Sequence, residues 1–255
     1  MERNTISQVR LARRDSYSAE SSPRFVSPDY RINRGIASYI DQLPNFRGKN
    51  FFRHLLERIK CSPSVSLLDI GCGQGVLLAQ LREIYSEQRL SLFGISGYDY
   101  RRSAPFRFAE NLESVDYRLG DIQRLRKVFE GQHFDIIVSV CAFYYLADPL
   151  NALRASYSML KPGGILFVHD PGIMGAEREA RGLENYWRNG CGIEAELHSD
   201  KYHFATFNIS MKKSRKKLPL PFKYNFLAHF SYQGYVLDRK KVLGEVGKSV
   251  GVPPF

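Results

Sequence analysis

The stretch LLDIGCGQGVLL at residues 67–78 constrains the fold more than any other part of this sequence. An apolar run that carries Asp69 near its end leads into glycines at positions 71, 73 and 75. From Val76 onward the apolar residues recur with helical spacing. This pattern predicts a strand, a tight loop and a helix, and glycines without a Cβ let a ligand approach the loop backbone.

The loop differs from a dinucleotide-binding fingerprint in its third glycine. The Gly-x-Gly-x-x-Gly pattern requires a glycine at position 76, where this chain has Val76, and the third glycine falls at Gly75 instead. A carboxylate just ahead of the loop suits a cationic or hydroxyl-bearing ligand better than a pyrophosphate. The sequence therefore predicts a ligand other than NAD.

Strand-like and helix-like segments alternate after this point. Apolar runs with strand character lie at 65–70, 90–98, 115–119, 134–140 and 164–169, with segments of helical length between them. Parallel strands need long crossover connections, which are usually helices. We therefore expect an α/β fold with a doubly wound, mostly parallel sheet covered on both faces.

Length and composition limit the class of protein. The chain has 255 residues with 44% hydrophobic content, enough for one domain with a substantial core. Its apolar runs are shorter than the roughly 18 residues that a membrane span needs. The four cysteines form no Cys-x-x-Cys pair, and no histidine cluster has metal-ligand spacing. We expect a cytoplasmic protein with reduced thiols, no membrane span and no metal site.

Four regions follow from the patterning. Residues 1–30 are rich in Ser and Arg, and we expect an arm that is flexible or becomes ordered only on a ligand. Residues 31–63 carry two amphipathic patterns and form a helical cover, the second helix ending at Cys61-Ser62-Pro63. The alternating core spans 64–211. Residues 212–255 form a basic, aromatic extension.

The sequence carries a net charge of +11, part of it in the run KKSRKK at 212–217. Such a run attracts polyanions, including nucleic acid, or simply forms a solvated basic rim. The aromatic residues that follow it suit a surface that stacks on single-stranded bases, and equally an apolar flap over a small-molecule pocket.

Several motifs resemble those of the class I S-adenosylmethionine-dependent methyltransferases. LLDIGCGQG resembles the first motif of that family, SGYDY at 96–100 the second-strand motif and YRLGDIQRL at 117–125 the third. The segment from Phe134 to Asp170, which includes Lys161-Pro162-Gly163-Gly164, resembles the fourth strand through the fifth. The resemblance covers about residues 64–211 and implies the Rossmann-like methyltransferase fold, whose sixth and seventh strands are expected in IEAELH and FATFNISMKKS, the last of them antiparallel.

The resemblance also implies S-adenosylmethionine as cofactor. Gly71, Cys72 and Gly73 would lie against its methionyl end, with Asp69 near its amino group, directly or through water. The second-strand acid would accept both ribose hydroxyls, and we assign it to Asp99, since the alternative position holds a serine.

Three further positions match the cofactor motifs. Asp121 would meet the adenine amino group and Ile122 would flank the ring. Cys141, just past the fourth strand, would line the cofactor or substrate side, or is simply a small buried hydrophobic residue.

Candidate catalytic and substrate-binding residues follow the fourth and fifth strands. His169, at the end of the fifth strand, is a candidate general base, although a histidine at a strand end also serves as a cap or packs in the core. Tyr144 and Tyr145 are candidate substrate-binding residues, with packing of a lid as the alternative.

The methyl acceptor is less defined. Amino-methylases of DNA carry Asn or Asp, two prolines and an aromatic residue after the fourth strand, where this chain has SVCAFYY. We therefore expect transfer to an O, N or C nucleophile of a small molecule. The alternatives are an RNA methyltransferase that uses the basic C-terminal segment, and a non-catalytic module that binds S-adenosylmethionine.

Overall fold

A computed structural model describes residues 35–97, 109–143, 146, 149–169, 181–182, 184–199 and 207–218. The predicted arm at 1–30 and the extension from 219 onward lie outside the described residues. So do three predicted site residues, Asp99, Tyr144 and Tyr145.

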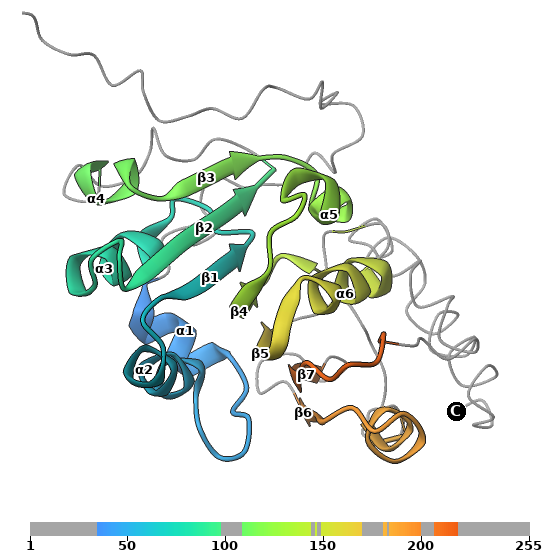
Figure 1. The fold of residues 1–255 in the computed structure, drawn as a ribbon. Coiled ribbons are helices and arrows are strands. Elements are labelled where there is room, and N and C mark those ends of the chain that lie inside the picture. The colour runs from blue at the N-terminus through green and yellow to red at the C-terminus, as the bar shows by residue number, and fades with distance from the viewer. Residues whose placement is uncertain are drawn as a thin grey trace, which may run out of the picture.

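The described chain is organised around a seven-stranded sheet in the order β3-β2-β1-β4-β5-β7-β6, which Figure 1 shows edge to edge. The strands are β1 (Val65–Ile70), β2 (Leu90–Ser96), β3 (Asp116–Leu119), β4 (Phe134–Val140), β5 (Leu160–His169), β6 (Ala195–Ser199) and β7 (Phe207–Lys212). The predicted bounds of β1 and β4 are confirmed. Both strands are buried along their whole length, which is why their sequences are nearly continuous apolar runs.

Strands β1 to β5 run parallel, and β7 is antiparallel to both β5 and β6. Because β7 lies between β5 and β6 and is antiparallel to both, β6 runs in the same direction as the first five strands. The antiparallel strand is therefore β7, the last strand in sequence, and not the edge strand β6. The chain order reverses between β1 and β4. Ligands of open α/β sheets bind at such a point, beside the carboxyl ends of the strands.

Helices cover both faces of the sheet (Figure 1). They are α1 (Ile36–Gln42), α2 (Phe51–Cys61), α3 (Val76–Ile84), α4 (Ala109–Glu113), the 3₁₀ turn η3 (Ile122–Arg124), α5 (Leu125–Val128), α6 (Pro149–Ser158) and the π-helical turn η5 (Tyr186–Gly190). The predicted helical cover is confirmed for α1 and α2. Helix α2 begins after Asn50, whose side chain accepts a hydrogen bond from the Arg53 amide, and it ends at Cys61 ahead of Pro63.

Two hydrophobic cores lie on the two faces. Val65 and Leu67 of β1 face a core that includes residues of α1, α2 and α3, whereas Leu68 and Ile70 face a core with residues of α5, α6 and η5. Side chains of a strand alternate between faces, so a buried central strand supplies both cores.

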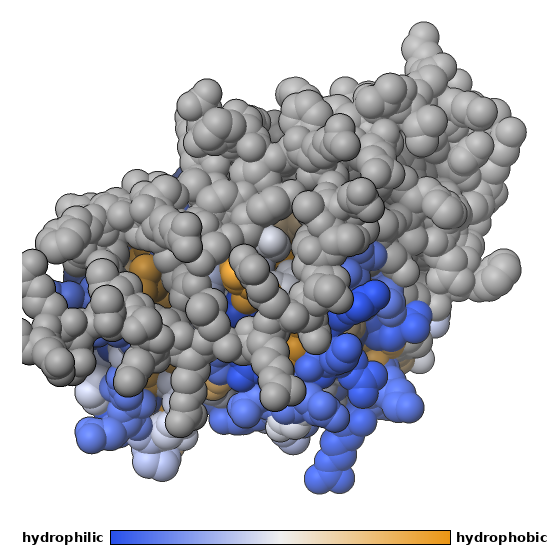
Figure 2. All heavy atoms as spheres, turned by 90° about the horizontal axis from the view of Figure 1, so that it is seen from above, coloured by the Kyte–Doolittle hydropathy of each residue, from blue (hydrophilic) through white to orange (hydrophobic). Residues whose placement is uncertain are grey.

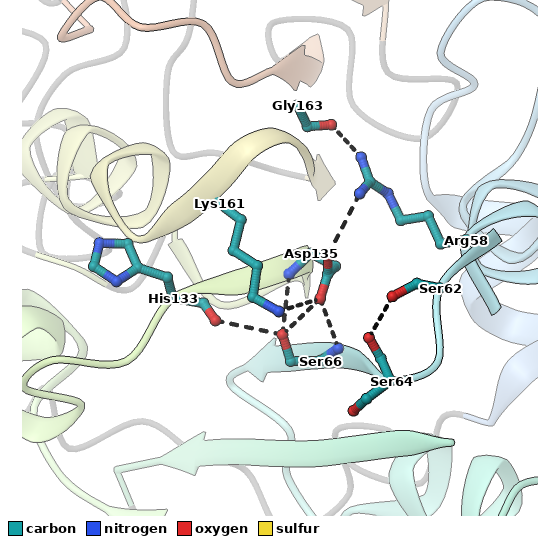
Figure 3. A network of polar contacts seen from close by, with 8 residues as sticks. All are labelled: Arg58, Ser62, Ser64, Ser66, His133, Asp135, Lys161 and Gly163. Atoms are coloured by element: carbon teal, nitrogen blue, oxygen red, sulfur yellow. Dashed lines mark hydrogen bonds and ion pairs between the residues drawn. The ribbon is translucent and has the colours of Figure 1, made fainter. Parts of the chain in front are cut away.

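A polar network joins the amino ends of three strands (Figure 3). The Asp135 carboxylate accepts hydrogen bonds from Lys161 Nζ at 2.7 Å and from the amide and hydroxyl of Ser66 at 2.9 Å. Arg58 of α2 lies 3.5 Å from Asp135 and donates to the Gly163 carbonyl. The network fixes α2 to β1, β4 and β5 at the end of the sheet opposite the glycine loop.

Where described residues are visible from the β3 side, many are hydrophilic, and hydrophobic residues appear in separate patches (Figure 2). Among the residues that the structure describes, the exposed large hydrophobic side chains are Ile84, Leu119 and Tyr186. No described helix combines the length and apolarity required to cross a bilayer.

Candidate functional site

The glycine loop connects β1 to α3 in a conformation that only glycine adopts readily. Gly71, Gly73 and Gly75 all have positive φ angles, of 76°, 54° and 75°. The amides of Gly71 and Cys72 both donate to the Ile95 carbonyl of β2, at 2.8 and 3.1 Å. The Tyr117 hydroxyl of β3 donates to the Gly73 carbonyl at 2.7 Å in a buried hydrogen bond. Two neighbouring strands therefore hold the loop in place.

Close packing gives two of the glycines a second role. A Cβ on Gly71 would lie 2.3 Å from the Cβ of Ala142, which follows β4, and a Cβ on Gly75 would lie 2.8 Å from Leu112 of α4. The loop after β1 thus fits directly against the segment after β4, at the point where the strand order reverses.

Asp69 is the buried charge of the site. It is 0% exposed, one residue before the end of β1. The Tyr39 hydroxyl of α1 lies 2.9 Å from each of its carboxylate oxygens. Burial raises the pKa of Asp69 to about 7, and the hydrogen bond from Tyr39 opposes this rise. A buried carboxylate of this kind favours a cationic ligand, because a cation offsets its desolvation.

Asp121 and Ile122 lie beyond the end of β3. Asp121 caps η3, and its Oδ1 accepts a hydrogen bond from the Gln123 amide at 2.9 Å. Ile122 is partly buried against the core on the α5 and α6 face. The Asp121 carboxylate and the apolar Ile122 side chain therefore lie next to β3, which is separated from β1 and Asp69 by β2.

The carboxyl end of β4 is tied to both neighbouring strands. The Ser139 hydroxyl donates to the Ile70 carbonyl at 2.9 Å, and the Cys141 amide donates to the His169 carbonyl at 3.2 Å. Cys141 has a φ of 54°, which is uncommon for a residue other than glycine and occurs often at functional sites. The partly exposed Cys141 thus lies at the reversal of strand order, where the sequence analysis expected a site residue.

His169 ends β5 opposite Val140 and is 2% exposed. This burial is compatible with a core role and with a base shielded from bulk water, so its catalytic role stays a prediction.

The structure brings most of the predicted site residues to one end of the sheet, where the parallel strands terminate. Asp69, the glycine loop, Asp121, Cys141 and His169 all lie at or beyond the carboxyl ends of the parallel strands. Tyr39 and Tyr117 were not among the site residues predicted from the sequence. Tyr39 occurs in an amphipathic helix and Tyr117 in a short strand, so in the sequence both resemble ordinary core aromatics.

The basic run at 212–217 lies at the opposite end of the sheet, beside the amino ends of the parallel strands. Lys212 pairs with Ile165, and the Lys213 amide donates to the Gly164 carbonyl at 2.7 Å, near the start of β5. Because β7 is antiparallel to β5, its carboxyl end points away from the glycine loop. The run therefore borders the Asp135 network and not the candidate site.

Comparisons with known proteins agree with this arrangement. A family model described as "Methyltransferase domain" matches residues 33–208. The chain is 31% identical over 135 residues to an uncharacterized 37.1 kDa protein in transposon TN4556 of Streptomyces fradiae, over 52% of this chain and 38% of that protein. It is 26% identical over 195 residues to the ubiquinone biosynthesis O-methyltransferase of Parvibaculum lavamentivorans, over 69% of this chain and 70% of that enzyme.

One similar solved structure is the plantazolicin methyltransferase BpumL in complex with a triazolic desmethylPZN analog and SAH. The similarity has a TM-score of 0.47 and 16% sequence identity, and it covers 65% of this chain and 82% of that chain. The chain spans 38% of the length of the Streptomyces relative. The family match covers well over half of the chain, including both helices of the cover, the glycine loop and all of β1 to β6. The chain therefore belongs to the class I S-adenosylmethionine-dependent methyltransferase family.

Proposed function

We propose that this protein transfers the methyl group of S-adenosylmethionine to an O, N or C nucleophile of a small-molecule acceptor. The observation that carries the proposal is the fully buried Asp69 carboxylate beside the glycine loop at the carboxyl end of β1. A buried acid with a pKa raised to about 7 matches the ammonium group of the cofactor's methionyl end.

The residues fit the cofactor as follows. Asp69 would hold the amino group directly or through water, and the backbone from Gly71 to Gly73 would lie along the methionyl chain. Asp121 would accept from the adenine amino group beside Ile122. Asp99 would accept from the ribose hydroxyls, a role that stays a prediction.

The chemistry demands mainly positioning. When bound, the cofactor supplies an electrophilic methyl group, and the protein contributes alignment of the acceptor and removal of a proton where the acceptor requires it. His169 is the proposed base, because an imidazole titrates near neutral pH and lies at the same sheet edge as the glycine loop. Tyr144 and Tyr145 are proposed to contact the acceptor.

Two observations favour a small molecule over RNA. The relative from Ruegeria pomeroyi, 31% identical over 103 residues and 38% of its length, is named as a ubiquinone biosynthesis O-methyltransferase. The basic run borders the opposite edge of the sheet, so its charges are remote from the glycine loop. RNA binding through the extension remains the second candidate, on the strength of the net charge of +11.

The first test is binding. Isothermal titration with S-adenosylmethionine and with S-adenosylhomocysteine should show heat for both, and a folded sample without heat for either ligand would contradict the cofactor assignment.

The second test uses radiolabelled cofactor with a metabolite extract or total RNA. Label in small molecules alone supports the main proposal, and label in RNA supports the alternative. Bound cofactor without transfer would indicate a binding module.

A basic-run variant separates these outcomes further. Arg215, Lys216 and Lys217 are exposed, so their change to Gln should leave the fold intact, whereas Lys213 stacks at 4.3 Å from the Tyr157 ring and is left unchanged. The variant should keep full turnover on its acceptor. Loss of turnover with intact cofactor binding would favour RNA.

A further inference from the structure

The contact between α1 and Asp69 is built from several interactions. The Tyr39 hydroxyl is equidistant from both Asp69 oxygens, and Tyr39 is 3% exposed. Its ring packs edge-on against Phe51 of α2, with a centroid separation of 6.1 Å. The amide of Ile36, the first residue of α1, donates to the Gln80 side chain of α3 at 2.8 Å. Helix α1 is thereby held against the helix that follows the glycine loop.

Among the described residues, Tyr39 is the main polar side chain that affects the pKa of Asp69. Its neighbours in β2 and β4 are Gly94 and Val138, which have no titratable side chain. Cys72 is the titratable group of the loop, and its Sγ lies over Gly94. Within the described part of the chain, burial and the Tyr39 hydroxyl determine the pKa of Asp69, with no contribution from Lys, Arg or His.

We propose that Tyr39 is a positioning residue for the cofactor, whose hydroxyl helps keep Asp69 ionised and orients its two oxygens before the ligand's amino group arrives. This inference rests on the proposed function, since it concerns the same site. A hydroxyl has one proton to donate and a carboxylate has about four lone-pair positions, so Tyr39 leaves capacity for the ligand's ammonium. The residue acts through Asp69 and needs no contact with the reacting atoms.

This arrangement links binding to pH. Below the pKa of Asp69 the carboxyl group is neutral, and affinity for an ammonium group should fall about tenfold per pH unit. Loss of the Tyr39 hydroxyl removes a hydrogen bond to the charged form, and the group should then protonate at a pH about one unit higher. An α-amino group loses its charge near pH 8, which sets the alkaline side of the profile independently of Tyr39.

The experiment is isothermal titration of the full chain with S-adenosylhomocysteine between about pH 5 and about pH 9, a range that brackets both groups. The wild type should show a bell-shaped dependence of affinity on pH. Tyr39→Phe should move the acid side of this profile upward by about one pH unit, with the alkaline side unchanged. Binding should weaken about fivefold near pH 7 and about tenfold at lower pH. Asp69→Asn should abolish the acid side altogether.

The matched control is Tyr157→Phe. The Tyr157 hydroxyl accepts from the Ser214 amide at 2.9 Å, near the amino ends of the strands, so its loss should leave both sides of the profile in place. Thermal melting of each variant reports the fold. A Tyr39 of purely structural importance would lower affinity equally at every pH, and that result, or an unmoved acid side, would overturn the inference. A wild type without any binding would instead count against the proposed function.

Discussion

The hydroxyl of Tyr39 and the carboxylate of Asp69 meet at 2.9 Å in the interior, between a helix of the N-terminal cover and the central strand of the sheet. One hydrogen bond only partly offsets the burial of this carboxylate, and the pKa of Asp69 is raised to about 7. The ionised site therefore lowers the stability of the ligand-free protein, in exchange for affinity toward a cation.

This relationship predicts how stability depends on pH. An unfolded Asp has a pKa near 3.9, so the folded state binds the proton more tightly. The folded protein should therefore gain stability as the pH falls from about 7 toward about 4, and Asp69 should contribute at most about 4 kcal/mol. Urea unfolding across this range measures the effect. Asp69→Asn should remove most of the dependence, and an unchanged slope in that variant would contradict the assignment.

Asp135 makes the opposite contribution. Burial alone would raise the pKa of Asp135, but hydrogen bonds from Lys161 and Ser66 outweigh burial and lower it. A carboxyl group with a lowered pKa stabilises the fold above its unfolded value of about 3.9, and this stabilisation is lost as the pH falls through the lower folded value. Acid unfolding should therefore begin below about pH 4.

Removal of this carboxylate should be costly at neutral pH. Asp135→Ala leaves Lys161, Arg58 and Ser66 without their shared acceptor and should cost about 2–3 kcal/mol in chemical unfolding, since Lys161 is partly hydrated. The control is Glu57→Ala, which breaks the exposed pair of Lys49 and Glu57 and should have no measurable effect. Equal losses in the two variants would contradict the role of the network.

Gly71 offers a test of the loop packing with a matched control. Gly71→Ala places a Cβ 2.3 Å from the Cβ of Ala142, whereas Gly48→Ala has a similar φ of 73° and no atom within 4 Å. Gly48→Ala should cost about 1 kcal/mol from backbone strain alone, and Gly71→Ala about 2–4 kcal/mol because strain and overlap combine.

The overlap can be relieved separately. Ala142→Gly removes the opposing Cβ, so the double variant should recover the excess cost of Gly71→Ala and leave only the strain. If the double variant instead lost the sum of the stabilities lost by Gly71→Ala and by Ala142→Gly, the two loops would not be in close contact.

The second-strand acid is tested by cofactor affinity. Asp99→Ala should weaken binding of S-adenosylhomocysteine by well over tenfold, because a carboxylate that accepts two hydroxyls contributes about 2–4 kcal/mol. Ser96 ends β2 and is 3% exposed, and Ser96→Ala should change affinity far less. The reverse ranking in titration would assign the ribose contact to the strand end.

Much of the fold could be predicted from the sequence because local chemistry determines it. β1 and β4 lie at the predicted bounds, since strands buried on both faces are continuous apolar runs. The strand, glycine loop and helix around Asp69 follow from spacing alone. β5 begins at Leu160, earlier than its apolar run at 164, because its first residues pair with β4 through an irregular register that hydrophobicity does not report.

The tertiary structure decided the features that depend on residues far apart in the chain. Tyr39 reaches Asp69 across 30 residues, and Ala142 closes against Gly71. The antiparallel direction of β7 beside β5 carries the basic run to the amino ends of the parallel strands, away from the glycine loop. Composition and periodicity report which face of an element is buried, but partners are chosen by packing between elements, and packing exists only once the chain has folded.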